Sequence, residues 1–317
     1  MKNKLLAFLL SIFVCSANAQ LNIGAPGAMR PSSFSKKEME TFKASTSYFV
    51  MREKDKAQQT KIEELLKGIW NYNKIEVIDF DAYKKIANNA NAIFFGLRSY
   101  NSNAEYVSSA DLFGKYATYT KVYIQLWQNL EVKKEGHLEE TIIARIETTY
   151  PWKGADALKE RISIEAFEYL CKNEINIPEW NLGILKNYLQ VINQCMNTNT
   201  TRWKFEGTVD KEQITKLQNE TLYVNDAVLK TLDPRETESP LKSYTYKYEM
   251  INVDDLGAKI LSSEKPFYYL MVYKNGSEKI TTVVNSKTGE FIYTQYKGMA
   301  YYFKEKDILN LLNAISK

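Results

Sequence analysis

The sequence predicts an α/β protein of two related strand–helix–strand lobes joined by a helical connector. One observation is an internal similarity: residues 74–97 (KIEVIDFDAYKKIANNANAIFFGL) and 247–270 (KYEMINVDDLGAKILSSEKPFYYL) share Lys, Glu, Ile, Asp, Phe and Leu at matched places. Another is the order within each copy, a β-favouring run, an acidic helix start and a second, more apolar run. The third is the helical periodicity of residues 151–218, which separate the copies.

Composition places the chain among folded proteins and limits its partners. Of its 317 residues, 44% are hydrophobic and 25% are charged, which excludes a disordered class. The formal net charge is +4 and falls to +2 without Lys2 and Lys4 of the N-terminal segment. Such a small charge argues against nucleic acid or an anionic membrane surface as the partner.

Residues 1–19 predict a cleavable secretory signal peptide. Two lysines precede the apolar run LLAFLLSIFV, and the segment ends in Ala-Asn-Ala before Gln20. A charged start, an apolar middle and a small-residue end are the three parts of such a signal. We therefore expect a chain that is exported, to the periplasm or beyond, and that starts at Gln20.

A lipid anchor on Cys15 is the alternative to a cleaved signal. That processing requires a small residue before the cysteine, and Val14 occupies the place. After cleavage, no stretch approaches the ~20 apolar residues that cross a bilayer. The mature chain is therefore expected to have no transmembrane segment.

The first lobe is predicted over residues 44–150, after a flexible leader at residues 20–43 that contains several Gly and Pro. A strand at 92–97 is apolar on both faces, which is typical of an interior strand covered by helices on each side. Residues 99–109, rich in Asn and Ser, are expected to form a surface loop. The other predicted elements are a strand at 47–51, a helix at 55–70, a strand at 75–78, a helix from 79, and strands at 121–127 and 141–150.

The helical connector, residues 151–218, has two periodic segments at 162–172 and 181–196. These segments hold Cys171 and Cys195. If they form an antiparallel pair of helices, the cysteines lie roughly 20 Å apart at 1.5 Å per residue. A disulfide requires Cα atoms within about 7 Å, so we predict two buried, unpaired thiols.

The second lobe, residues 219–317, opens with a strand at 221–224, which we align with the first lobe by matching Val224 to Val50. Its first helix is expected to be poor because prolines interrupt the segment. Two hairpin turns and a closing helix follow, indicated by Asn275-Gly276, by residues 285–289, and by the apolar stripe of Ile308, Leu311, Leu312 and Ile315.

No sequence motif indicates catalysis or a cofactor. His137 is the only histidine, and no Gly-x-Ser-x-Gly element is present to complete a catalytic triad with it. One histidine and two widely spaced cysteines do not provide a zinc site. Both common glycine-rich phosphate-binding loops are also missing from the sequence. We therefore expect a surface histidine and no cofactor.

Paired acidic residues follow the second strand of each lobe, Asp79 with Asp81 and Asp254 with Asp255. Carboxylates at the C-terminal end of a strand can hold Mg²⁺ or Ca²⁺. Asp at a helix start is also a favoured cap, worth ~1 kcal/mol. The capping role is the preferred interpretation.

Two resemblances add to this prediction. The C-terminal part has Pro266 before a strand, then a hairpin, a strand and a helix, and it resembles the second half of a thioredoxin-like domain without the Cys-x-x-Cys of redox chemistry. Residues 220–226, 246–260 and 287–293 are similar to a family of exported, two-lobed α/β proteins of Gram-negative bacteria. That resemblance implies export and fold, and no activity.

Our first functional hypothesis is an exported, non-catalytic protein that binds a protein or glycan partner or serves in envelope assembly. Residues 121–127 alternate, with Tyr123 and Trp127 on the face opposite the aliphatic side chains. Aromatic residues of this kind are enriched at binding surfaces, so this face is the candidate partner surface. The alternative is that the helical connector covers it.

The second hypothesis is a hydrolase of an envelope or extracellular polymer that uses carboxylates, with Asp79 and Asp81 as first candidates. Buried carboxylates with shifted pKa values, clustered in a cleft, would favour the enzyme. Carboxylates that cap helices and face solvent would favour the binding protein.

Overall fold

The structure is a computed structural model that describes residues 20–27, 30–106, 115–132, 138–149, 156–159, 161, 163–235, 238–275, 278–300 and 302–317. The predicted signal peptide and His137 lie outside the described residues. Among the described residues, no helix combines the length and apolar character needed to cross a membrane.

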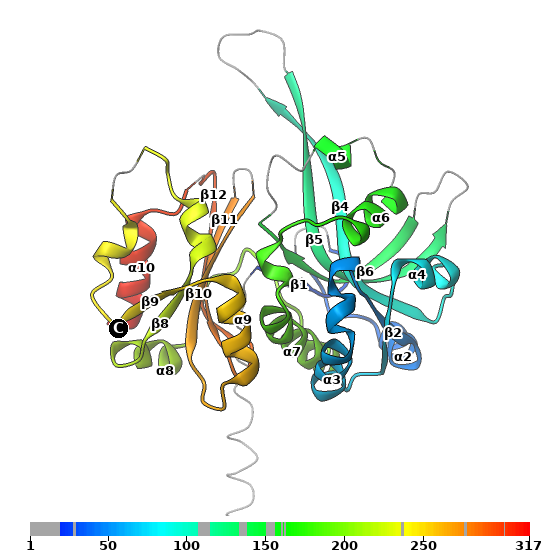
Figure 1. Ribbon diagram of the computed structural model, residues 1–317, viewed down its shortest axis with the longest axis horizontal. Helices are drawn as coiled ribbons and strands as arrows, with labels where there is room; N and C mark the ends of the chain where they lie inside the picture. Colours follow the sequence, from blue (N-terminus) through cyan, green and yellow to red (C-terminus); the bar gives the residue numbers. More distant parts are fainter. Residues whose placement is uncertain are drawn as a thin grey trace, which may run out of the picture.

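The chain forms two lobes, each built on a six-stranded mixed sheet (Figure 1). The strands of the first sheet are β1 (Leu21–Ile23), β2 (Thr46–Val50), β3 (Lys74–Ile78), β4 (Ala92–Tyr106), β5 (Lys115–Val132) and β6 (Leu138–Glu147). Those of the second are β7 (Thr208–Val209), β8 (Leu222–Asn225), β9 (Tyr248–Ile251), β10 (Tyr268–Asn275), β11 (Glu278–Asn285) and β12 (Phe291–Gly298). The predicted α/β fold class with two lobes is confirmed.

The two sheets have the same strand order and the same strand directions. The first reads β1-β6-β5-β4-β2-β3 and the second reads β7-β12-β11-β10-β8-β9. In each, the three strands of the similar segments are parallel, and the remaining neighbours are antiparallel. The second lobe ends in the predicted strand, hairpin, strand and helix.

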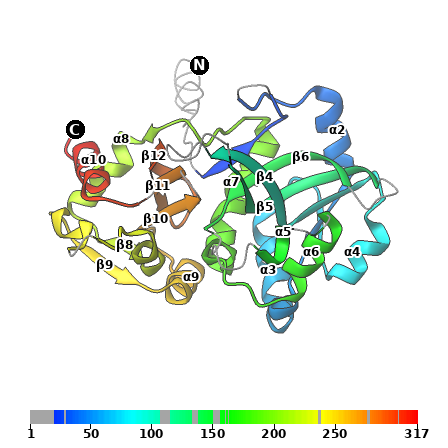
Figure 2. The ribbon, with the colours of Figure 1, turned by 90° about the horizontal axis from the view of Figure 1, so that it is seen from above.

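Helices cover the sheets and fill the space between the lobes. The α-helices are α2 (Lys36–Ala44), α3 (Gln59–Ile69), α4 (Phe80–Ile86), α5 (Asp156–Lys159), α6 (Ser163–Lys172), α7 (Leu182–Thr198), α8 (Lys211–Ile214), α9 (Val253–Ser262) and α10 (Glu305–Ile315). The 3₁₀ helices are η1 (Glu53–Gln58), η3 (Pro178–Trp180), η4 (Thr215–Gln218), η5 (Asp226–Thr231) and η6 (Pro240–Ser243). Helix α7 lies between the two sheets, with α3 and α9 beside it (Figures 1 and 2).

The largest apolar core is shared by the two lobes. Its members come from the first sheet, α7 and the second sheet, and they include Phe95, Leu126, Leu189, Tyr269 and Met271. A second core lies between the second sheet and α10, and a third lies between the first sheet and helices α4 and α6. The apolar stripe predicted for the helix at 181–196 is therefore the packing surface of α7.

The flexible leader predicted at residues 20–43 is wrong for most of its length. Strand β1 pairs with β6, with Leu21 opposite Ile146, and Leu21 is fully buried. Helix α2 follows, held by a capping box between Ser35 and Glu38. A strand of three residues is too short to show periodicity, so its pairing partner, far along the chain, decides its structure.

Two further expectations need correction. The surface loop predicted at residues 99–109 is strand as far as Tyr106, because β4 and β5 continue their pairing past Tyr100. The alignment of Val224 with Val50 is off by one residue: β2 and residues 221–225 share one burial pattern when Tyr48 matches Tyr223. A one-residue slip would exchange the two faces of the strand.

Cys171 in α6 and Cys195 in α7 are buried, free thiols, as predicted. Cys171 belongs to the core beneath α6, whereas Cys195 belongs to the core that the two lobes share. Burial raises the pKa of the Cys171 thiol. The two thiols act as small apolar side chains.

Candidate functional site

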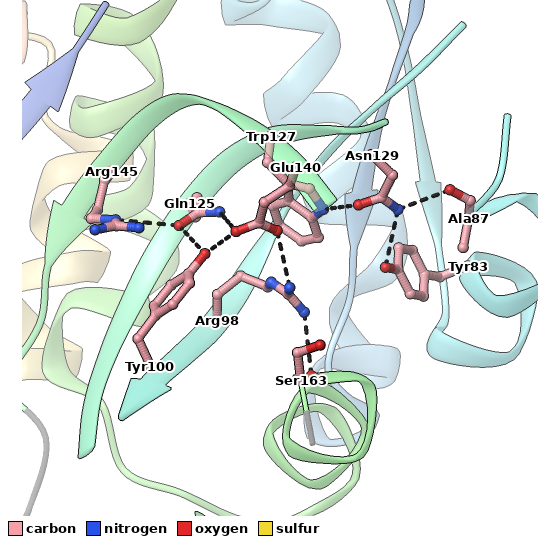
Figure 3. A network of polar contacts seen from close by, with 10 residues as sticks. All are labelled: Tyr83, Ala87, Arg98, Tyr100, Gln125, Trp127, Asn129, Glu140, Arg145 and Ser163. Atoms are coloured by element: carbon pink, nitrogen blue, oxygen red, sulfur yellow. Dashed lines mark hydrogen bonds and ion pairs between the residues drawn. The ribbon is translucent and has the colours of Figure 1, made fainter. Parts of the chain in front are cut away.

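A buried polar network lies on the face of the first sheet that α6 covers (Figure 3). It is built from β4, β5 and β6, whose alternate residues share this face. The register places Gln125 of β5 beside Arg145 of β6 and Arg98 of β4 beside Tyr123 of β5. Polar side chains on adjacent strands therefore converge at one place.

The carboxylate of Glu140 is the centre of the network. It accepts hydrogen bonds from Arg98 Nη2 at 2.9 Å, from Gln125 Nε2 at 2.9 Å and from the Tyr100 hydroxyl. Arg145 donates to Gln125 Oε1 at 3.3 Å and lies over the ring of Tyr100. This carboxylate is thus surrounded by donors from its own protein.

Arg98 is a buried cation whose charge is compensated. Its side chain is 2% exposed, and its guanidinium lies 5.2 Å from the Trp127 ring centroid and 5.5 Å from that of Phe167. Burial acts to lower the pKa of Arg98, but Glu140 and Tyr100 outweigh it, so the pKa is raised. Burial also raises the pKa of Tyr100, and Glu140 adds to that increase.

The aromatic face predicted as the partner surface is covered. Trp127 has no exposed surface and packs against Phe167 of α6, with ring centroids 5.5 Å apart. Its Nε1 donates to Asn129 Oδ1 at 2.9 Å. Tyr123 is 6% exposed and packs against Tyr100. Helix α6 of the helical connector covers Trp127, whereas Tyr100 and Arg145 of the same sheet pack against Tyr123.

A second buried cluster joins the two lobes. Glu147 of β6 accepts from Lys204 Nζ at 2.9 Å and from Tyr273 Oη of β10 at 2.9 Å. Lys204 also pairs with Glu278 of β11 at 3.0 Å. Burial acts to lower the pKa of Lys204, but the two carboxylates outweigh it and raise the pKa. One lysine thus faces two carboxylates across the junction, and Lys121, 4.0 Å from Glu278, supplies a second positive charge.

The acidic residues of the first lobe have structural partners. Asp79 caps α4, accepting from Ala82 N at 2.8 Å. Asp81 is exposed and pairs with Lys84 at 2.9 Å and Lys172 at 3.9 Å. The hydrogen bond from Lys84 and the charge of Lys172 lower the pKa of Asp81. The preferred capping role holds for Asp79.

In the second lobe the cap is a neighbouring residue. Asn252, at the position that matches Asp79, accepts from Asp255 N at 2.9 Å and begins α9. Asp254 accepts from Asn181 Nδ2 at 3.3 Å. Asp254 and Asp255 therefore lie in the first turn of the helix, where negative charge complements its dipole. Within the described part of the chain, no three His, Cys, Asp or Glu residues are grouped to hold a metal ion.

Arg52, directly after β2, is a buried residue that the sequence analysis did not single out. Its Nη2 donates to the carbonyls of Asn173 at 3.0 Å and Ile175 at 2.8 Å. Its Nε and Nη1 have no partner among the described residues. Nearby, a cavity of about 10 Å³, the size of one water molecule, is lined by residues that include Asp79, Asp81 and Cys171. It is too small for an organic substrate.

A groove of about 270 Å³ lies beside β3. Strand β3 is one of the two outer strands of the first sheet, the other being β1. Apolar and charged residues of β3 and α3 line the groove: Leu66, Ile75, Val77, Glu63, Lys67 and Glu76. No motif marks this site in the sequence, because it depends on β3 having a neighbour on one side only.

The fold and these sites define a two-lobed α/β protein with buried ion pairs inside it and an outer strand, β3, beside a groove. No protein-family model, curated protein or solved structure matches the chain.

Proposed function

We propose that this chain is an exported, non-catalytic protein that binds a partner in the cell envelope through the open edge of β3. The observation that carries the proposal is the groove between β3 and α3. A strand edge with unpaired main-chain groups accepts an added strand, and side chains of that strand enter the adjacent groove. The partner is then a protein segment in an extended conformation.

The direction of the main chain in β3 supports this mode of binding. Met51 N donates to Ile78 O at 2.8 Å, so the peptide groups of Ile78, and by alternation those of Glu76, point toward β2. The peptide groups of Ile75 and Val77 then point away from the sheet. Both side chains also line the groove, which therefore offers hydrogen bonds and apolar contact together.

A glycan is the less supported partner. Sugar rings bind well on aromatic side chains, and the residues that line the groove include none. The aromatic face with Tyr123 and Trp127 is buried and offers no surface. A protein segment fits the groove better on both counts.

The hydrolase remains the alternative proposal, with less support. Asp79 is occupied as a helix cap, and Asp81 is paired with lysines in contact with solvent. Under the binding proposal, the purified protein releases no fragments from envelope or extracellular polymers. Release that Asp79→Asn and Asp81→Asn abolish would replace the binding proposal with the enzyme.

We also propose that the lobes arose by duplication of one unit, and that residues 1–19 are removed as a signal peptide. The shared strand order and the aligned tyrosines, Tyr48 and Tyr223, support the duplication. The layout of the N-terminal segment supports export to the periplasm or beyond.

The binding proposal is tested by Val77→Pro beside Val77→Ala. Both variants lose the valine side chain, but only proline removes the outward N–H that an added strand requires. Tagged proteins are used to recover partners from the envelope fraction of the source cell. We expect Val77→Ala to recover the partner and Val77→Pro to lose it at least tenfold, while equal recovery would contradict binding at this edge.

A further inference from the structure

Gln20 lies buried at the junction of the lobes, with 1% of its surface exposed. Its Nε2 donates to Glu147 O at 2.6 Å and to Glu179 Oε1 at 3.4 Å. Its Oε1 accepts from the Tyr188 hydroxyl at 3.1 Å. These partners belong to β6, η3 and α7. The residue next to the predicted cleavage site is therefore part of the protein interior.

Glu179 is a buried carboxyl, and no lysine or arginine of the described residues forms an ion pair with it. It is 1% exposed, and its Oε1 accepts from Gln20 and from Thr149 N at 3.1 Å. Its Oε2 is the one buried carboxyl oxygen without a hydrogen-bond partner among the described residues. Burial raises the pKa of Glu179. An unpaired carboxyl in this position is costly and would gain from a positive charge.

The neighbouring carboxyl, that of Glu147, already has a cation partner. Both side-chain oxygens of Glu147 are occupied, Oε1 by Lys204 and Oε2 by Tyr273. The backbone of Glu147 is also bonded to Gln20, through its N–H to Gln20 O at 2.9 Å and through its carbonyl to Gln20 Nε2. A new cation at Gln20 would therefore find Glu179 as its unpaired carboxyl.

We infer that removal of residues 1–19 completes this junction, because the α-ammonium group created on Gln20 becomes the cation partner of Glu179. The inference rests on the proposed export and cleavage. Hydrolysis of the Ala19–Gln20 peptide bond leaves the new carboxylate on Ala19 and the new amine on Gln20, which takes up a proton. An α-amino group has a pKa of about 7.7–8.0 and is charged at neutral pH.

Cleavage thus acts as a maturation step for the lobe junction. Before it, the nitrogen of Gln20 is a neutral peptide nitrogen. After it, the same nitrogen carries a charge on the residue whose side chain already contacts Glu179. The junction of β6, η3 and α7 is then more stable in the processed chain than in any chain extended at its N-terminus.

The test compares two N-termini without relying on export. One protein is released from a fusion so that it starts at Gln20, and the other carries one extra alanine before Gln20. Each is made with Glu179, with Glu179→Gln, and with the exposed control Glu220→Gln. Urea unfolding is measured at pH 6, and mass spectrometry verifies that Gln20 keeps its free amine.

We expect the protein that starts at Gln20 to have a folded-to-unfolded ratio roughly tenfold higher than the extended one. This difference should vanish with Glu179→Gln and persist with Glu220→Gln. Equal stability of the two N-termini, or a difference that Glu179→Gln leaves unchanged, overturns the pairing. N-terminal sequencing of the exported protein tests cleavage separately: a start at Gln20 supports it, and another start refutes it.

Discussion

The ion pair between Arg98 and Glu140 combines two buried charges that are 2% and 8% exposed. Removal of one partner leaves the other charge buried and uncompensated, which costs about 3–5 kcal/mol. We therefore expect Glu140→Gln to lower the free energy of unfolding by about 3 kcal/mol in urea titrations. The control is Glu40→Gln, whose exposed pair with Lys36 should contribute less than about 0.5 kcal/mol. A loss at Glu140 no larger than in the control would refute the burial argument.

Asp307, at the start of α10, makes the stability of the second lobe depend on pH in the acid range. Burial acts to raise its pKa, but hydrogen bonds from Lys279, Lys297 and the backbone of Lys304 outweigh it, so the pKa is lowered. A lowered folded-state pKa stabilises the protein above the unfolded value of about 3.9, and this stability is lost as pH falls below it. Unfolding free energy measured from pH 5 to pH 2.5 should fall more steeply in the wild type than in Asp307→Asn. Parallel curves would assign the acid sensitivity to other groups.

The structural role of a single residue can be predicted from the sequence when its partner is close along the chain, and cannot when the partner is distant. The capping role of Asp79 can be predicted because its partner, Ala82 N, is three residues away, and any helix that starts there presents this N–H. Glu140 lies 42 positions from Arg98, and only the pairing of β4, β5 and β6 brings them together. The sequence predicts a cleavage site before Gln20, but the burial of Gln20 depends on β6 and α7, which come much later in the chain.

At the scale of elements, helices α7 and α9 are in close contact through two glycines. A Cβ on Gly183 would lie 2.3 Å from Gly257 O, and a Cβ on Gly257 would lie 1.8 Å from Asn181 Oδ1. We expect Gly183→Ala to destabilise the protein by about 2 kcal/mol or more, because its Cβ meets the backbone of α9 and the helices must separate. Gly257→Ala should cost about 1 kcal/mol, because it displaces the Asn181 side chain that caps α7.

Gly68, inside α3, is the matched control for this helix contact. A Cβ there meets no atom within 4 Å. Gly68→Ala should stabilise the protein by about 0.5–1 kcal/mol because alanine is the better helix former. Thermal or urea unfolding of the three variants should therefore give shifts of opposite sign. Stabilisation by Gly183→Ala would show that α7 and α9 can move apart at little cost.

Elements with local signals were predicted well, and those defined by pairing were not. The stripe of α7 and the turns at 285–289 follow from periodicity and turn chemistry, and both are found as expected. Strand β1 and the extension of β4 past residue 99 have no such signal. Their hydrogen-bond partners are strands distant in the sequence, and pairing with those strands outweighs the local preference for a loop.

The whole molecule is expected to unfold as one unit, because its largest core includes side chains of both sheets and of α7. Separated lobes would expose apolar surface such as Tyr269 and Met271. Calorimetry should give one transition, and Cys171 and Cys195 should react with a thiol reagent only across that transition. Two separated transitions, or rapid reaction of either thiol in the native protein, would contradict this coupling.

The position of β1 in the chain limits how early the first sheet can be completed during synthesis. A chain is made from its N-terminus, yet Leu21 has its strand neighbour at Ile146 and Ile23 bridges to Arg202. The earliest strand among the described residues must therefore wait while about 125 further residues are made before β6 exists, and until residue 202 for its second neighbour. Contacts so distant in sequence are slow to form, and apolar segments that wait for them are open to aggregation. We therefore expect the newly made chain to be prone to aggregation until the segment around Arg202 has been synthesised.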